Sequence, residues 1–142
     1  MDFNLFKQMY AETMMFYQCI ENDIKCIYAY MCAGNINKHF DEIENKTLGQ
    51  TIRILKKLDN SDGKPLINLE DYEFLEKICD NRNHWAHSVF TEFIYEDNWL
   101  YSKEYLEQCK RLKEDYVRIK NASKILERIR IQYCTNIRKG DY

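Results

Sequence analysis

The densest group of polar functional side chains in the sequence lies at residues 80–87, which read Asp-Asn-Arg-Asn-His-Trp-Ala-His. Arg82 offers a planar, permanently charged guanidinium that matches the geometry of a phosphate group. The imidazole of His87 can accept and donate a proton near neutral pH. Asn83 precedes His87 by four residues, so on a helix the two side chains share a face and the amide can orient the imidazole. Together these residue types indicate acid–base chemistry at a phosphate.

The spacing of Arg82 and His87 also bears on how such a site is assembled. The two residues are five positions apart, which corresponds to about 140° around a helix of 3.6 residues per turn. A single helix therefore does not readily aim both side chains at one atom. Two copies of the chain that meet across a two-fold axis would bring two arginines and two histidines into one cleft.

Other interpretations of this segment involve no catalysis. Arg82 could form a structural ion pair with Asp80 or Glu76. His87 could be a hydrogen-bonded histidine of the core. Asp80, His84 and His87 lie at i, i+4 and i+7, so a metal site along one helix face is conceivable. The sequence holds no second group of ligands at metal-site spacing, and we therefore expect no metal and no other cofactor.

The composition limits the fold that positions these residues. The chain has 142 residues, which suits one domain over 1–142, and its formal net charge is −2. With 45% hydrophobic residues, it can bury a core without disulfides or a structural metal. Only 4 glycines and 1 proline are present, which excludes collagen-like sequence and a turn-rich β-sandwich. Few turn formers favour few, long elements, so we predict an all-α fold.

The sequence also bears on the compartment in which the chain functions. No stretch approaches the roughly 20 consecutive apolar residues of a membrane-spanning helix. Residues 1–4 lack the basic region and apolar run of a secretory signal. The 6 cysteines include no Cys-x-x-Cys pair and fall on helical patterns, so we expect reduced, mostly buried thiols. These observations predict a cytoplasmic protein.

Hydrophobic periodicity predicts four helices, over about residues 3–33, 47–58, 68–89 and 102–133. Thr47, Asn68 and Ser102 stand at the starts of the last three and are residue types that cap helices. Residues 36–46 are charged and weakly patterned, which indicates a connection with room for a short turn of helix. Residues 60–65 form the clearest loop. Helices with short connections pack antiparallel, so the expected architecture is a single up-down four-helix bundle.

Charge is uneven along the chain despite its small net value. Residues 118–139 hold seven basic residues against one acidic residue. Lys120, Lys124 and Arg128 are spaced four apart within this segment and form one stripe on a helix. Such a stripe is either the solvated face of an amphipathic helix or a surface that binds a nucleic-acid backbone. The three residues are therefore candidate RNA-binding residues.

Arg82-Asn83 followed by His87 fits the pattern Arg-x4–6-His, in which asparagine usually follows the arginine. Residues 47–50, Thr-Leu-Gly-Gln, look like the segment that commonly opens the second helix of bundles carrying this pattern. The predicted helices stand in the expected order, with the motif late in the third. Most of the chain thus resembles the HEPN superfamily (higher eukaryotes and prokaryotes nucleotide-binding).

This resemblance implies a homodimer with the motif at the subunit interface and a metal-independent endoribonuclease activity. In such enzymes the 2′-hydroxyl of a ribose attacks the adjacent phosphate and leaves a cyclic phosphate end. Carried onto this sequence, His87 is the general base or acid, Arg82 holds the phosphate as charge develops, and Asn83 positions the pair. The implied setting is toxin–antitoxin, phage-defence or stress biology, with an antitoxin or a nucleotidyltransferase as a further partner.

The chain departs from the family toxins that are paired with a nucleotidyltransferase. Those toxins commonly carry a tyrosine two residues after the histidine, where they are modified. This chain has Val89 at that position, and its nearest downstream tyrosine is Tyr95. Two functions without catalysis also stay open. One is a HEPN interaction module that binds nucleotide, RNA or a protein partner, and the other is a helical partner-binding or immunity protein.

Overall fold

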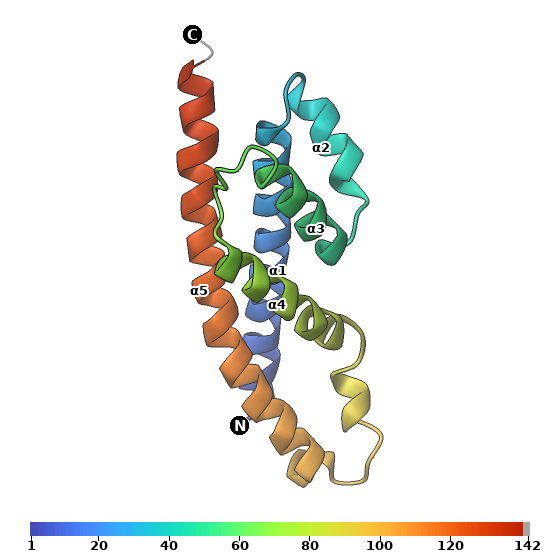
Figure 1. Cartoon of the computed structure of the whole chain (residues 1–142). Coiled ribbons are helices and arrows are strands. Elements are labelled where there is room, and N and C mark those ends of the chain that lie inside the picture. Colours follow the sequence, from blue (N-terminus) through green and yellow to red (C-terminus); the bar gives the residue numbers. More distant parts are fainter. Residues whose placement is uncertain (141–142) are drawn as a thin grey trace.

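All regular secondary structure among residues 1–140 is helical (Figure 1). The computed structural model describes the backbone of residues 1–140 and the side chains of residues 1–134. The elements in chain order are α1 (Phe3–Met31), α2 (Ile36–Glu44), α3 (Leu48–Asp59), α4 (Leu69–His87), the 3-10 turns η1 (Phe90–Glu92) and η2 (Trp99–Tyr101), and α5 (Lys103–Gly140). The predicted all-α class is confirmed. None of the described helices combines the length and apolar character that crossing a membrane requires.

Three helices begin at the capping residues that the sequence predicts. Thr47 Oγ1 accepts a hydrogen bond from Gln50 N (3.2 Å), and Gln50 Oε1 accepts one from Thr47 N (3.0 Å), which is a capping box. Asn68 Oδ1 accepts from Asp71 N (2.8 Å). The hydroxyl of Ser102 accepts from a backbone N–H in the first turn of α5 (3.0 Å). Each cap satisfies a donor that the first helical turn leaves without a partner.

Residues 36–46, which the sequence analysis treats as a connection, contain the nine-residue helix α2. Asn35 caps it by accepting a hydrogen bond from the backbone of its first turn (3.3 Å). Ile36, Phe40 and Ile43 recur at helical spacing, and Ile43 is buried. These apolar residues suffice to pack one face of α2 against α1, but a segment this short shows little periodicity. Residues 1–140 therefore form five α-helices, where the sequence predicts four.

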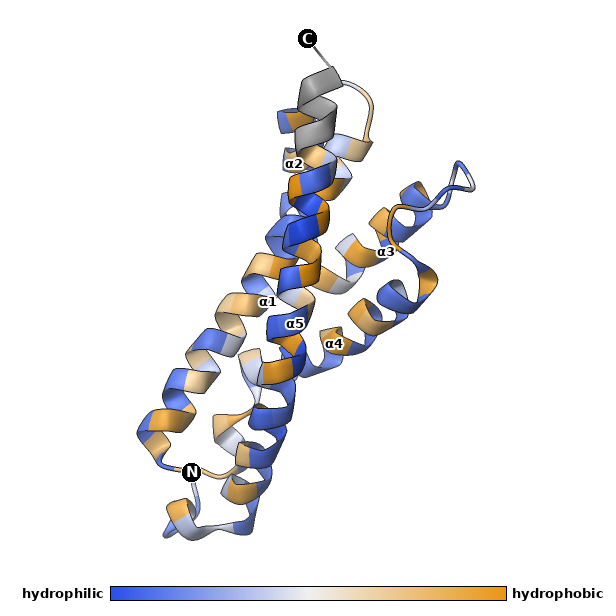
Figure 2. Cartoon of the chain, turned by 90° about the vertical axis from the view of Figure 1, so that its left-hand side faces the viewer, coloured by the Kyte–Doolittle hydropathy of each residue, from blue (hydrophilic) through white to orange (hydrophobic). Residues whose placement is uncertain are grey.

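The two longest helices, α1 and α5, run parallel and side by side (Figure 1). Tyr105 Oη donates a hydrogen bond to Met1 O (2.9 Å) near one end of the pair. Farther along, Arg130 Nε lies 2.7 Å from Asp23 Oδ1 in an ion pair. Because the chain reverses direction at each connection, the fifth helix returns to the direction of the first. The pair forms the long axis of the molecule, and α3 and α4 lie to one side of it (Figure 2).

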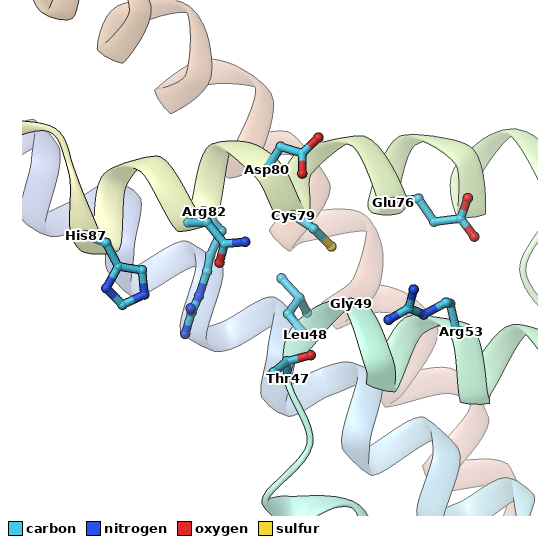
Figure 3. Close-up of a pocket in the computed structure, with 10 residues that line it drawn as sticks. Thr47, Leu48, Gly49, Arg53, Glu76, Cys79, Asp80, Arg82 and His87 are labelled. Carbon is cyan, nitrogen blue, oxygen red and sulfur yellow. The ribbon is translucent and has the colours of Figure 1, made fainter.

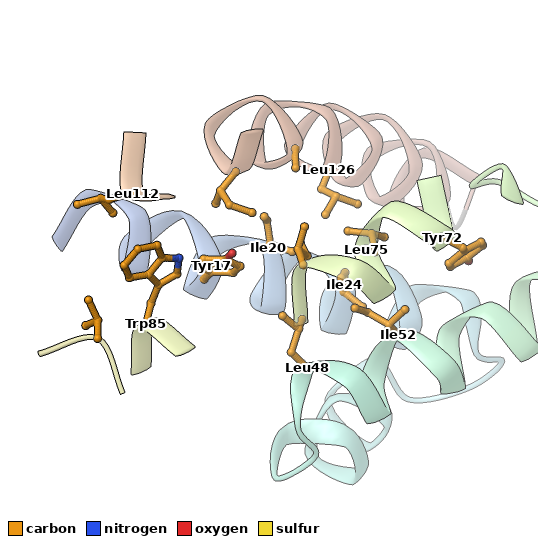
Figure 4. Packing of buried hydrophobic residues seen from close by; sticks show 14 of the residues in the cluster. Tyr17, Ile20, Ile24, Leu48, Ile52, Tyr72, Leu75, Trp85, Leu112 and Leu126 are labelled. Carbon is orange, nitrogen blue, oxygen red and sulfur yellow. The ribbon is translucent and has the colours of Figure 1, made fainter. Parts of the chain in front are cut away.

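One continuous apolar core joins α1, α3, α4 and α5 (Figure 4). Trp85 is fully buried in this core, so its ring cannot stack on a base. The other large side chains that are at most 2% exposed include Phe6, Tyr17, Ile20, Ile24, Ile52, Leu55, Tyr72, Leu75, Phe93, Tyr105 and Leu112. Burial of these side chains fixes α4 against the α1–α5 pair.

The α3–α4 connection is organised around the buried carboxylate of Asp59. This group accepts hydrogen bonds from Leu66 N (2.7 Å), Ile67 N (3.0 Å) and Tyr72 Oη (2.7 Å). Burial, together with the neighbouring carboxylate, raises the pKa of Tyr72, so the phenol stays protonated and keeps donating. The three bonds hold the last turn of α3 beside the first turn of α4 and define the antiparallel hairpin.

Replacing Asp59 with alanine should lower the free energy of unfolding by about 3 kcal/mol, because two backbone donors and one phenol lose their acceptor in a buried place. The matched control is Asp62→Ala in the same connection, where the carboxylate accepts one exposed bond from Lys64 N (2.9 Å). Urea unfolding followed by circular dichroism measures both. Equal losses in the two variants would contradict the role of Asp59.

Candidate functional site

A groove of about 620 Å³ lies between α3 and α4 (Figure 3). Its lining comes from the start of α3 and the second half of α4. The lining residues are Thr47, Leu48, Gly49, Arg53, Glu76, Cys79, Asp80, Arg82, Asn83 and His87. All three residues of the predicted catalytic motif, Arg82, Asn83 and His87, are among them. The structure therefore gathers the motif at one cavity.

Arg82 and His87 both border the groove although they are about 140° apart around α4. The groove follows α4 from Glu76 to His87, so it meets more than one row of side chains. Figure 3 shows both side chains extending from α4 on the side where α3 begins. Arg82 is half-buried, while Asn83 and His87 are exposed. A second copy of the chain is thus not needed to bring an arginine and a histidine to the same groove.

The side chains of the motif have no structural partners. Within residues 1–134, no hydrogen bond or ion pair involves the side chains of Arg82, Asn83 or His87, so the amide does not orient the imidazole as the sequence suggests. Glu76, which the sequence suggests as an ion-pair partner of Arg82, is instead paired with Lys56 (3.2 Å). His87 is exposed and is not a core histidine. The purely structural interpretation of Arg82 and His87 therefore finds no support in the side-chain contacts.

The opposite face of α4 is held by the carboxylate of Asp115 on α5, which is 2% exposed. It accepts hydrogen bonds from Trp85 Nε1 (2.6 Å), Tyr17 Oη (2.7 Å) and Asn81 Nδ2 (3.2 Å). Arg111 Nη2 donates to Asn81 Oδ1 (2.9 Å), so both ends of that amide are used. Desolvation, followed by the charge of Asp115, raises the pKa of Tyr17 and keeps its hydroxyl a donor. One carboxylate thereby joins α1, α4 and α5.

The carbonyl of Trp85 is held as well. The backbone N–H groups of Ser88 and Val89 both bond to His84 O, at 2.9 and 3.1 Å, so the last turn of α4 leaves Trp85 O without its usual helical donor. Tyr10 Oη on α1 donates to that carbonyl (2.8 Å). Trp85 is thus bonded at its ring and at its backbone, two residues from His87. This double attachment sets the rotation of the motif around the axis of α4.

His84 is engaged on the same structural face. Its Nε2 lies 2.6 Å from Gln108 Oε1, and since that oxygen only accepts, Nε2 carries the proton. The metal site conceivable from Asp80, His84 and His87 is therefore not assembled, because His84 turns to α5. Among residues 1–134, no group of three or more His, Cys, Asp or Glu side chains has an arrangement that could hold a metal ion.

Cys79 borders the groove but is not an activated nucleophile. Burial is the main cause that raises the pKa of its thiol, and the charges of Asp80 and Glu76 raise it further. The positive charges of Arg53 and Arg82 lower it and only partly offset that effect. The thiol also lies 3.3 Å from Leu75 O, to which it donates. A neutral thiol therefore borders the groove.

Arg53 is a groove residue that the sequence analysis does not single out. It stands four residues after Gly49 on α3, so both face α4, and its side chain is exposed. A methyl group at Gly49 would lie 3.9 Å from Cys79 Sγ, which is ordinary contact, so the glycine is not needed to bring α3 close. The pattern Gly-x-x-x-Arg, which begins two residues after the capping residue Thr47, is the only sequence signal for this position.

The basic stripe of α5 does not reach the groove of its own chain. Lys120, Lys124 and Arg128 are absent from the groove lining, and Lys124 and Arg128 are exposed. Lys120 Nζ lies 5.8 Å from the ring centroid of Tyr116, a cation–π contact on the surface. Their role in RNA binding stays a prediction. The side chains of Arg138, Lys139 and the rest of residues 135–142 lie outside the described part.

Comparison of the chain with protein-family models, with curated proteins and with solved structures finds no match. The resemblance to the HEPN superfamily is therefore a prediction from the motif and its place in a helical chain. The functional interpretation rests on the groove, on the free side chains of the motif and on the contacts that position α4.

Replacing Asp115 with alanine should lower the free energy of unfolding by about 4 kcal/mol, because one donor on α1 and two on α4 lose their buried acceptor. The control is Glu114→Ala. Because Glu114 is exposed, this substitution should change the free energy of unfolding by less than about 0.5 kcal/mol. Urea unfolding measures both, and the emission of Trp85 should shift to longer wavelength in the Asp115 variant. A stability loss shared by the two variants would show that the carboxylate does not organise the core.

Proposed function

We propose that the chain is a metal-independent endoribonuclease of the HEPN type that acts as a homodimer. The observation that supports this most is the division of α4 into two faces. Asn81, His84 and Trp85 carry the structural hydrogen bonds, whereas Arg82 and His87 border an open groove and bond to nothing within residues 1–134. Charged and titratable groups left without partners beside a cavity are suited to act on a ligand.

The chemistry that fits these groups is intramolecular phosphoryl transfer. The 2′-hydroxyl oxygen of a ribose bonds to the adjacent phosphorus, and the bond from phosphorus to the 5′-oxygen of the next nucleotide breaks. Arg82 binds the non-bridging phosphate oxygens and stabilises the negative charge that develops on them. His87 removes the proton of the 2′-hydroxyl or protonates the leaving 5′-oxygen. The products are a 2′,3′-cyclic phosphate end and a 5′-hydroxyl end.

The need for both a base and an acid favours a dimer. The motif of one chain contains a single exposed histidine, since His84 is bonded to Gln108. A second copy placed across the open groove would supply the other His87, so that one imidazole accepts a proton while the other donates one. In this proposal α1, α3, α4 and α5 form the four-helix HEPN bundle, and α2 is an addition to it.

The proposed setting is the cytoplasm, in a toxin–antitoxin, phage-defence or stress system. Val89, which stands where related toxins carry a modified tyrosine, is 1% exposed, whereas Tyr95 is 84% exposed. A nucleotidyltransferase could therefore not act at position 89. The proposed partner is an antitoxin that covers the groove or a nucleotidyltransferase that acts at another residue.

Wild-type protein in EDTA should cleave mixed RNA and leave cyclic phosphate ends. Arg82→Ala and His87→Ala should each reduce the rate by about 10²–10⁴-fold, because they remove charge stabilisation and proton transfer respectively. His39→Ala is the control, since it deletes the same kind of side chain from α2, outside the groove. Gel analysis of labelled RNA, with the ends identified by mass spectrometry, measures the effect.

Equal activity in wild type and in both groove variants would refute the proposal and indicate another site. Absence of cleavage by an intact wild-type dimer would refute the enzyme as well. Salt-sensitive RNA binding in that case would identify the non-catalytic module, and a stable complex with another chain without RNA affinity would identify an immunity or partner-binding protein.

The triple variant Lys120→Gln, Lys124→Gln, Arg128→Gln tests the path of RNA along α5. Each lost phosphate contact should lower the slope of log affinity against log salt by about 0.7, so the total change should be about 2. The rate at saturating RNA should stay unchanged because the stripe lies outside the groove. A matched triple variant at Lys103, Lys110 and Lys113, all exposed on the first half of α5, is the control. Similar slopes for the two triple variants would assign the stripe to a solvated face.

A further inference from the structure

Two arginines from different helices line the same groove. Arg53 extends from α3 and Arg82 from α4, and both act electrostatically on the thiol of Cys79. Figure 3 shows Cys79 between them, with Arg82 on the side of His87 and Arg53 on the far side. Within residues 1–134, neither guanidinium takes part in a hydrogen bond or an ion pair. Two cations thus share a cavity without a protein counterion.

The acids of the groove do not neutralise this charge. Glu76 forms an ion pair with Lys56 (3.2 Å), which lies on the same helix as Arg53. Asp80 is the other acid of the lining, and it is exposed. The lining therefore contains two unpaired arginines and one unpaired carboxylate, that of Asp80. His87 lies at one end of the groove. Phosphate groups bound to the two arginines would offset this positive charge.

We propose that Arg53 is a phosphate-binding residue for single-stranded RNA, which holds the phosphate next to the one bound by Arg82 and His87. This assignment rests on the proposed function and names its substrate more closely. From Cys79 to His87 the groove follows α4 for eight residues, or about 12 Å of helix. A strand in a helical conformation carries one phosphate about every 3.4 Å of helix axis, so more than one phosphate fits along this length.

The size of the groove limits the substrate to a single strand. A volume of about 620 Å³ is that of a site for a drug-sized ligand. A few nucleotides of one strand can enter such a space, whereas a duplex cannot. Guanidinium groups bind phosphate in a bidentate manner and carry no information on the base. Arg53 should therefore contribute affinity that does not depend on the sequence of the RNA.

The test is the affinity of the full chain for a fluorescein-labelled 2′-O-methyl octanucleotide, which lacks the attacking hydroxyl and is not cleaved. Arg53→Ala should weaken binding about tenfold, because a charge-assisted contact to phosphate is lost. It should also lower the slope of log affinity against log salt by about 0.7. The control is Lys57→Ala, which removes one positive charge from an exposed position of α3 outside the groove. Fluorescence anisotropy at several salt concentrations measures both variants.

The site would be established if Lys57→Ala changes the affinity by less than about twofold while Arg53→Ala weakens it by the expected tenfold. Equal effects of the two substitutions would overturn it, as would failure of the wild type to bind the oligonucleotide. The binding assay and the cleavage assay together distinguish failure of the phosphate site from failure of the proposed ribonuclease activity. Binding that depends on Arg53, without cleavage of unmodified RNA, would leave the phosphate site in place and reject the ribonuclease. Cleavage of RNA by the wild type, together with unchanged binding by Arg53→Ala, would support the ribonuclease and reject the phosphate site at Arg53.

Discussion

The carboxylate of Asp115 is the group on which the relative arrangement of α1, α4 and α5 depends. A buried carboxylate is destabilising unless hydrogen bonds replace its hydration, and this one accepts three. Its donors come from α1 and from two positions of α4, so the bonds form together only when the three helices have one relative position. Because Trp85 and Asn81 point at Asp115, the residues between and beside them point elsewhere. The orientation of Arg82 and His87 toward the groove follows from the direction in which Asn81 and Trp85 point.

This arrangement separates stability from function along one short stretch of helix. Residues 81, 84 and 85 serve the core, and residues 82, 83 and 87 serve the groove. The polar groups of the core are satisfied by protein, while those of the groove are left to solvent or to a ligand. A helix whose every polar side chain were used in packing could not bind phosphate. Without Asp115, the same helix would lose the bonds of Asn81 and Trp85, two of the contacts that fix its rotation and the direction of the motif.

Local features could be predicted from the sequence because their causes lie within a few residues. The caps at Thr47, Asn68 and Ser102 are of this kind, since each acts on the turn that follows it. That Arg82, Asn83 and His87 share one helix was predictable for the same reason, because they are close in sequence. By contrast, the bonds to Asp115 join residues 30 or more positions apart, and no local pattern reports such a pairing. One signal was present, because Asp115 stands in the apolar row of Leu112, Ile119 and Leu126.

Two other features depended on how elements meet in space. Arg53 became a groove residue only when α3 packed against α4, and α2 was too short for its apolar positions to form a visible pattern. The addition of α2 also changed the relation between the first and last helices, which run parallel. The basic stripe of α5 was read correctly as a row on one face, yet its distance from the groove of the same chain depends on the packing of α5.

The two-face organisation of α4 is tested most directly by the imidazole resonances of the 3 histidines, followed by NMR while a 2′-O-methyl dinucleotide is added. His87 borders the groove, His84 is bonded to Gln108, and His39 lies on α2 beside Glu42. The structure predicts that the signals of His87 shift as the dinucleotide binds, while those of His84 and His39 stay in place. Shifts at His84 with none at His87, or no shift at any of the three, would contradict it.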